Sequence, residues 1–341
     1  MSGTGFPLYA AALSVLLGTA TVAAAPVADL YDRAQRAGVE VIVDGHLDGS
    51  GVIVSSKGLV LTAAHLVRGE HLEIRSRHLG RHRVAVVAVD VGHDLALLRL
   101  PRRTAAYPHL PLAQRSPPPP ADVYLYGSPL YRHSVLLRGT LARSSPTYEY
   151  QPQRGHYVRV THVSGSSPVG TSGGPWLDPR GRIIGIQSGL VHDGTAPAGL
   201  AYMAPLTAVR RLLRTARTGP VSSLRAGFEE LWEQGPALRA LFPEGTEGIL
   251  PVRIVPGGPA DRAGLRPTDL IVAIEGEPVS LRDELLDRVR ARQPYEPVIL
   301  TILRPRVGPL RVPVNLDDLN RSVPSPVHVL ALDAGKTTVR P

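Results

Sequence analysis

The chain has 341 residues, a formal net charge of +9 and no cysteine. The lack of cysteine excludes disulfides, thiolate metal sites and a cysteine nucleophile, so stability must come from burial and backbone pairing. The positive charge is almost all arginine, scattered along the chain without a nucleic-acid-binding motif. We therefore expect a solvated basic surface and no specific nucleic-acid partner.

The N-terminal segment is apolar, and residues 1–28 carry no charged side chain. Residues 6–22 are largely apolar and three alanines follow, which is typical of a secretory signal peptide, although Lys or Arg is missing from its start. The alternative is an uncleaved membrane anchor, since the stretch is just long enough to span a bilayer. We expect residues 1–25 to be one or the other, and both predict a periplasmic or otherwise extracytoplasmic protein.

Residues 30–112 predict a first β-barrel of six short antiparallel strands separated by glycine-containing and basic turns. The predicted strands are residues 39–43, 52–54, 59–61, 72–75, 84–89 and 95–100. Two of these strands adjoin a side chain that could take part in catalysis. The third leads into small residues and His65, and the sixth is preceded by Asp94, a lone carboxylate that needs a partner such as an imidazole N–H.

The remaining histidines of this region carry no clear metal pattern. His78 and His82 are four residues apart, but arginines flank them and Gly80 lies between them. These neighbours favour a solvated loop, so we expect no metal and no cofactor.

Four prolines at 117–120 form a stiff connector to a second barrel that ends near Met203. Its predicted strands are residues 123–126, 134–142, 157–161, 175–177 and 183–190. The loop at 144–153 gives no specific signal. Residues 206–217 are amphipathic and basic, which indicates a helix that closes the domain.

Ser172 lies in the glycine-rich stretch 169–176, with Gly170 before it and two glycines directly after it. A nucleophilic serine needs a tight bend, free N–H groups facing the developing oxyanion, and room for an acyl group, and glycines supply all three. The order His65, Asp94, Ser172 is that of chymotrypsin-like proteases, in which the three act as base, orienting acid and nucleophile.

Taken together, these motifs resemble those of HtrA-type (DegP/DegS-like) serine proteases. The matching segments are residues 49–54, 62–65, 94–100, 126–130, 170–175 and 199–202. The resemblance implies a mainly β fold, a chymotrypsin-like double β-barrel over residues 30–217 followed by a linker at 218–223 and a PDZ domain at 224–316. Residues 317–341 have little apolar periodicity and are expected to be a disordered tail. The oxyanion would be held by the backbone N–H groups of Gly170 and Ser172.

The C-terminal third resembles a PDZ domain, in which an extended peptide adds a strand beside a helix. By position, Ala226, Gly227 and Phe228 would form the loop that holds a peptide's C-terminal carboxylate. We expect an inserted helix at 231–241, and a helix capped by Ser280 that runs to about Arg292. A small β-rich cap without a ligand is the alternative.

Some residues depart from the family pattern. Thr171 cannot form the ion pair that activates digestive proteases, and no internal lock of the loop around Gly170 is evident. The uncharged segment 164–169 predicts cleavage after small or medium apolar residues. Tyr31 is the only aromatic residue near the mature N-terminus, which leaves a homotrimer open.

The resemblance implies an extracytoplasmic serine endopeptidase of protein quality control that cuts unfolded or misfolded proteins and binds peptide C-termini at its PDZ domain. One alternative is a membrane-anchored regulatory protease that cuts a single signalling substrate. Another is an inactive peptide-binding scaffold, which the presence of all three triad residues does not favour.

Overall fold

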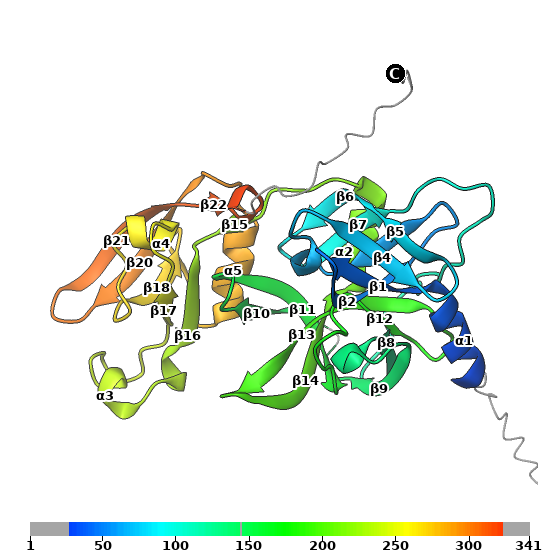
Figure 1. Cartoon of the computed structure of the whole chain (residues 1–341). Coiled ribbons are helices and arrows are strands. Elements are labelled where there is room, and N and C mark those ends of the chain that lie inside the picture. The colour runs from blue at the N-terminus through cyan, green and yellow to red at the C-terminus, as the bar shows by residue number, and fades with distance from the viewer. Residues whose placement is uncertain (1–26, 144, 323–341) are drawn as a thin grey trace, which may run out of the picture.

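The computed structural model describes residues 27–143 and 145–322 (Figure 1). The predicted leader at 1–25 and the tail beyond residue 322 lie outside these residues. The predicted mainly β fold class is confirmed, with two seven-stranded sheets followed by a smaller sheet. In Figure 1 the two large sheets lie on one side of the molecule and the C-terminal sheet on the other.

The first sheet has the strand order β5-β4-β1-β2-β3-β7-β6. Its strands are β1 (Gly38–Val43), β2 (His46–Ile53), β3 (Leu59–Thr62), β4 (Leu72–Ser76), β5 (Gly80–Arg83), β6 (Ala85–Asp90) and β7 (Leu95–Arg99). The six predicted strands are present, and β5 is a seventh where we predicted a solvated loop. Its side chains are mostly exposed and it is paired only with β4. Backbone pairing without a buried face leaves no hydrophobic pattern to detect.

The second sheet has the order β10-β11-β14-β13-β12-β8-β9, and it closes because β11 also pairs with β9. Its strands are β8 (Ala121–Gly127), β9 (Val135–Leu141), β10 (Thr147–Gln151), β11 (His156–Gly165), β12 (Pro175–Leu177), β13 (Ile183–Asp193) and β14 (Ala196–Pro205). Sequence analysis missed β10, which lies in the loop that gave no signal. It also missed β14, whose first four residues are exposed.

Two helices pack where the barrels meet. Helix α1 (Val27–Ala37) contributes Leu30 and Ala34 to the core between the barrels, and α2 (Leu206–Thr215) contributes Val209 and Leu212. The predicted closing helix is thus present and ends two residues early, because Ala216 adopts a left-handed conformation. This shared core fixes the two barrels against each other, and the cleft between them with it.

The C-terminal sheet has the order β16-β17-β18-β20-β21, with β19 paired to β18. Its elements are β16 (Ala226–Glu230), α3 (Pro236–Arg239), β17 (Ile249–Ile254), α4 (Pro259–Arg262), β18 (Leu270–Ile274), β19 (Glu277–Pro278), α5 (Arg282–Arg290), β20 (Pro297–Arg304) and β21 (Gly308–Asn315). The inserted helix is shorter than predicted: a 3-10 turn (Leu231–Glu233) comes first, and Gly235 and Pro236 interrupt the segment.

The predicted Ser280 cap is wrong. Leu281 precedes α5, and the Glu284 carboxylate accepts the N–H groups of Ser280 (3.1 Å) and Leu281 (3.2 Å). An acid at the third helical position thus accepts N–H groups at the start of the helix, where we had predicted a serine cap.

The end of the linker and the start of the tail are also more ordered than predicted. In the linker, β15 (Ser222–Ser223) pairs with β22 (Asp317–Asp318), and a 3-10 turn (Leu319–Ser322) follows. Leu319 is 2% exposed. The predicted disordered tail therefore begins no earlier than residue 323, because burying this leucine and pairing two short strands close the C-terminal domain.

The hairpin of β10 and β11 connects the two halves of the molecule. It belongs to the second barrel, and in Figure 1 it extends toward α5 and β16. Tyr148 and Tyr157 from this hairpin are 2% and 4% exposed and belong to the hydrophobic core of the C-terminal domain. The core of that domain thus includes side chains from the barrel.

Candidate active site

Two hydrogen bonds join His65 to Asp94, and a third joins Asp94 to the neighbouring Ala64. His65 lies in a 3-10 turn (Ala64–Leu66) just after β3, and Asp94 immediately precedes β7. The His65 ring Nδ1 lies 2.8 Å from Asp94 Oδ2, and the His65 backbone N–H donates to Oδ1 at 3.0 Å. The Ala64 N–H donates to the Asp94 carbonyl at 3.1 Å. With Nδ1–H donating to the carboxylate, His65 Nε2 carries a free lone pair and can accept a proton.

Two further side chains donate to Asp94, which is completely buried. The Ser188 hydroxyl donates to Oδ2 at 2.6 Å, and Arg154 Nη1 donates to Oδ1 at 3.1 Å. Burial raises the pKa of Asp94 to about 7, while the hydrogen bond from Ser188 and the nearby His156 act to lower it. The two carboxylate oxygens thus accept four donors, which orients both His65 and the carboxylate itself.

Gly170 sits in the turn that precedes Ser172 and has a φ of +93°. A Cβ at this position would lie 2.2 Å from the Ser128 carbonyl oxygen, so a side chain is excluded on two grounds. The Thr171 N–H donates to the Pro168 carbonyl at 3.2 Å. Within the described residues, the N–H groups of Gly170 and Ser172 donate to no protein acceptor. Two free donors flanking a serine can hold an oxyanion.

Hydrogen bonds from other residues of the chain hold the loop around Gly170 in place, although we had expected no internal lock. The buried Thr171 hydroxyl donates to the Pro168 carbonyl at 2.7 Å. Ser50, on β2 of the first barrel, donates its hydroxyl to the Gly170 carbonyl at 2.8 Å and its N–H to the Ser172 carbonyl at 2.7 Å. Short hydroxyls thus supply the restraint that an ion pair supplies in digestive enzymes.

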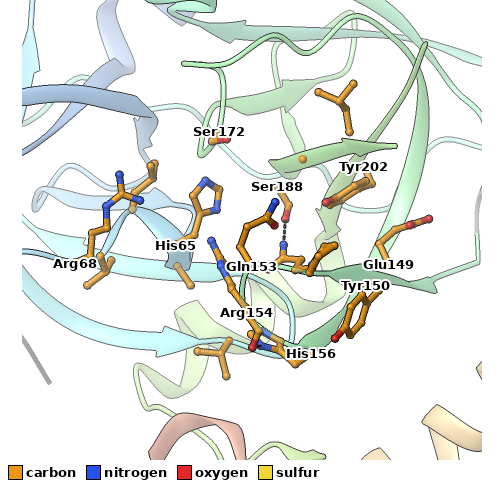
Figure 2. A pocket seen from close by; sticks show the side chains of 18 of the residues that line it. His65, Arg68, Glu149, Tyr150, Gln153, Arg154, His156, Ser172, Ser188 and Tyr202 are labelled. Carbon is orange, nitrogen blue, oxygen red and sulfur yellow. Dashed lines mark hydrogen bonds between the residues drawn. The ribbon is translucent and has the colours of Figure 1, made fainter. Parts of the chain in front are cut away.

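His65 and Ser172 both line a cleft of about 1670 Å³. Figure 2 shows Ser172 above His65, Ser188 and Tyr202 to their right and Arg154 below His65. No hydrogen bond joins the Ser172 hydroxyl to His65 in the described part of the chain. Such bonds are often long in a ligand-free protease and tighten when substrate binds.

The predicted peptide-binding residues do not line this cleft, although Arg225, directly before them, does. Ala226, Gly227 and Phe228 form the start of β16 and are buried rather than looped out. The Phe228 N–H donates to the Tyr157 hydroxyl at 2.8 Å, and this hydroxyl donates to the Phe228 carbonyl at 3.0 Å. The backbone groups expected to hold a C-terminal carboxylate are therefore already engaged by the barrel hairpin at Phe228.

The described residues contain neither a candidate metal site nor a candidate membrane-spanning helix. No group of three or more His, Asp or Glu side chains in the described residues could hold a metal ion. No helix within residues 27–143 and 145–322 is long and apolar enough to cross a membrane.

Tyr31 donates its hydroxyl to the Ser134 carbonyl at 2.8 Å and lies against Tyr126, so its contacts here are within its own chain.

Sequence analysis missed several residues that shape the site. Arg154 and Gln151 lie at the tip of the hairpin β10–β11, in and beside the loop that gave no signal. Ser188 lies on a strand that we predicted, and Ser50 lies between two glycines in a segment that we noted without giving the serine a role. No motif marks any of them, because their importance depends on contacts with Asp94 or Ser172 across the fold.

The sequence is also similar to known protein families and to curated proteins. Residues 49–186 match the trypsin-like peptidase domain, and residues 252–304 match the PDZ domain. Putative serine protease HhoA from Synechocystis sp. is 29% identical over 247 residues, covering 68% of this chain and 61% of HhoA. Serine protease HTRA1 from Xenopus tropicalis is 28% identical over 260 residues, covering 71% of this chain and 54% of HTRA1. The chain thus spans less than two thirds of the length of these relatives.

Other similar proteins match over more of their length. Serine endoprotease DegS from Escherichia coli (strain K12) is 25% identical over 293 residues, covering 83% of this chain and 80% of DegS. The structure of the HtrA-type protease AlgW with a decapeptide has a TM-score of 0.61 at 19% identity, covering 86% of this chain and 99% of that one. A trypsin-like peptidase domain followed by a PDZ domain, together with these relatives, supports an HtrA-type serine protease.

Proposed function

We propose that this protein is an extracytoplasmic serine endopeptidase of protein quality control, which cuts unfolded or misfolded proteins. The observation that supports it best is the convergence of three features on one cleft. His65 is oriented by a buried carboxylate, Ser172 lines the same cleft, and the N–H groups of Gly170 and of Ser172 itself are free. The apolar, alanine-rich N-terminal segment of the sequence supports an extracytoplasmic location.

In the proposed reaction, the Ser172 hydroxyl attacks the carbonyl carbon of a peptide bond while His65 Nε2 takes its proton. The negative charge that develops on the carbonyl oxygen is held by the N–H groups of Gly170 and Ser172. His65 then gives the proton to the leaving amine, and an acyl group remains on Ser172. Water, deprotonated by His65, releases the acyl group, and Asp94 stabilises the imidazolium in both halves.

Peptide binding by the PDZ domain is the less direct part of the proposal. Structures of AlgW that hold a decapeptide and a tripeptide support it by likeness. The matched PDZ region begins at residue 252, beyond the predicted carboxylate loop at 226–228. In this chain a peptide reaching Phe228 would first have to displace the Tyr157 hydroxyl.

The test is the cleavage of an unfolded protein by the wild type and by Ser172→Ala, with product termini read by mass spectrometry. Ser172→Ala should lose several orders of magnitude in activity and all labelling by a serine-directed fluorophosphonate probe. Turnover near the wild-type rate in Ser172→Ala would refute the serine mechanism. Cleavage of one folded substrate, with unfolded proteins left intact, would replace quality control by regulatory proteolysis.

A further inference from the structure

Arg154 stands out because it brings a cation to the carboxylate that orients His65. It lies in the turn between β10 and β11, where its backbone N–H donates to the Gln151 carbonyl at 3.0 Å. Its Nη1 lies 3.1 Å from Asp94 Oδ1, and its side chain is 30% exposed. Burial lowers the pKa of Arg154 to about 10, so the guanidinium stays charged at neutral pH. A charged guanidinium at this distance both orients the carboxylate and offsets its charge.

The turn that carries Arg154 is anchored by the C-terminal domain. Three residues further on, the Tyr157 hydroxyl makes two hydrogen bonds to the backbone of Phe228 on β16. Arg290 of α5 donates to the Tyr157 carbonyl at 2.7 Å. On the other strand of the hairpin, the Tyr148 hydroxyl donates to Asp287 of α5 at 2.8 Å.

The two hydrogen bonds between Tyr157 and Phe228 are buried, and the bonds from Arg290 and Tyr148 are partly buried. Tyr148 and Tyr157 are almost fully enclosed by the core of the PDZ domain, and Arg290 is satisfied by two carbonyl oxygens. A buried N–H left without its acceptor is destabilising, so moving the hairpin away from the PDZ domain is unfavourable. The PDZ domain thus fixes both strands of the hairpin whose tip touches Asp94.

We propose that Arg154 is a positioning residue for Asp94 and that the PDZ domain holds it there by binding the β10–β11 hairpin. The domain then supports the catalytic carboxylate through its own fold, with Tyr157 of the barrel in place of a peptide at Phe228. This inference rests on the proposed function, since it assigns a partner to the acid that orients His65.

The decisive measurement is the pH dependence of kcat/KM on a short chromogenic peptide. The groups around Asp94 that bear on it are His65, His156, Tyr202 and Arg154. Removing the Arg154 charge favours protonation of the His65–Asp94 pair. In Arg154→Met the midpoint of the acid limb should therefore move to higher pH by about 1 unit, while Arg154→Lys should restore most of the wild-type position.

Two hairpin variants test the role of the PDZ domain. Tyr157→Phe removes both hydrogen bonds to Phe228 and should move the acid limb in the same direction as Arg154→Met, by less. Tyr150→Phe is the matched control, because Tyr150 lies on the same hairpin and its hydroxyl makes no hydrogen bond within the described residues. It should leave the midpoint where it is.

A second control addresses the loss of an arginine in itself. Arg138 makes a similar ion pair with Asp122 on β9 and β8, with Nη2 and Oδ2 2.8 Å apart and the arginine side chain mostly exposed. Arg138→Met should leave both kcat/KM and its pH profile unchanged. Thermal unfolding of every variant confirms that the comparison is between folded proteins.

Each experimental outcome bears on a different claim. An acid limb that stays in place in Arg154→Met, with the wild type active and dependent on Ser172, would overturn the inference and leave the proposed function standing. A shift in Arg154→Met that Tyr157→Phe does not reproduce in any degree would overturn the role of the PDZ domain. A wild type without Ser172-dependent activity would instead refute the proposed function.

Discussion

His156 gives a prediction whose size can be worked out from the structure. It begins β11, is 7% exposed, and its ring Nδ1 lies 3.3 Å from the Arg154 carbonyl oxygen. Its Nε2 is buried and has no partner among the described residues. Burial lowers the pKa of His156 from 6.5 to about 4, and the positive charge of Arg290 adds to this effect. The folded protein therefore keeps this ring neutral while the unfolded chain protonates it.

The stability that depends on a neutral His156 is fully present above pH 6.5 and is lost as the pH falls toward 4. One pKa unit corresponds to about 1.4 kcal/mol, so the loss between pH 7.5 and pH 5 should be about 2 kcal/mol. Asp94 acts in the opposite sense, because its raised pKa stabilises the fold at low pH and this stability is lost as the pH rises through about 7. Asp94 is present in both proteins of the comparison below, so this contribution cancels apart from the part through which His156 itself lowers the pKa of Asp94.

The substitution is His156→Asn, which retains an N–H donor for the Arg154 carbonyl and cannot be protonated. Urea unfolding of the wild type and the variant at pH 7.5 and pH 5 measures the difference. Trp176 is completely buried in the second barrel, so its fluorescence follows the unfolding of the protease domain. The free energy of unfolding of the wild type should fall relative to the variant by about 2 kcal/mol. Equal pH dependence in the two proteins, to within about 0.5 kcal/mol, would refute the reasoning.

Two further predictions concern the cleft. Gly170→Ala places a side chain in a turn with a φ of +93° and against the Ser128 carbonyl. The turn must therefore rearrange, and kcat should fall by about 10²–10³. A wild-type kcat would show that the Gly170 N–H does not hold the oxyanion. Cleavage should follow Val, Ala, Ile or Leu, because the carboxylates that line the cleft are paired, Asp48 with Arg68 and Glu149 with His162. Product termini dominated by Arg or Lys would contradict this prediction.

Most of the fold could be predicted from the sequence, because short buried strands and turn residues leave local patterns. The barrel strands that face the core were found for this reason, as were α2 and the PDZ-like segment. Two of the elements that were missed have no such pattern. Strand β5 has mostly exposed side chains, and β14 begins with four exposed residues. The linker and tail gain order only by pairing with each other across about ninety residues of sequence.

For the site, the sequence by itself determined which chemistry is present: a histidine, a lone carboxylate and a serine among glycines, in an order that matches one kind of protease. Only the tertiary structure decided what surrounds them. Arg154 and Ser188 reach Asp94 from the second barrel, and Ser50 reaches the Ser172 turn from the first. Tyr157 fills the place at Phe228 that the sequence offered to a peptide. These partners are 60 or more residues apart along the chain, and a contact between distant residues depends on how whole strands pair and pack, which no local pattern encodes.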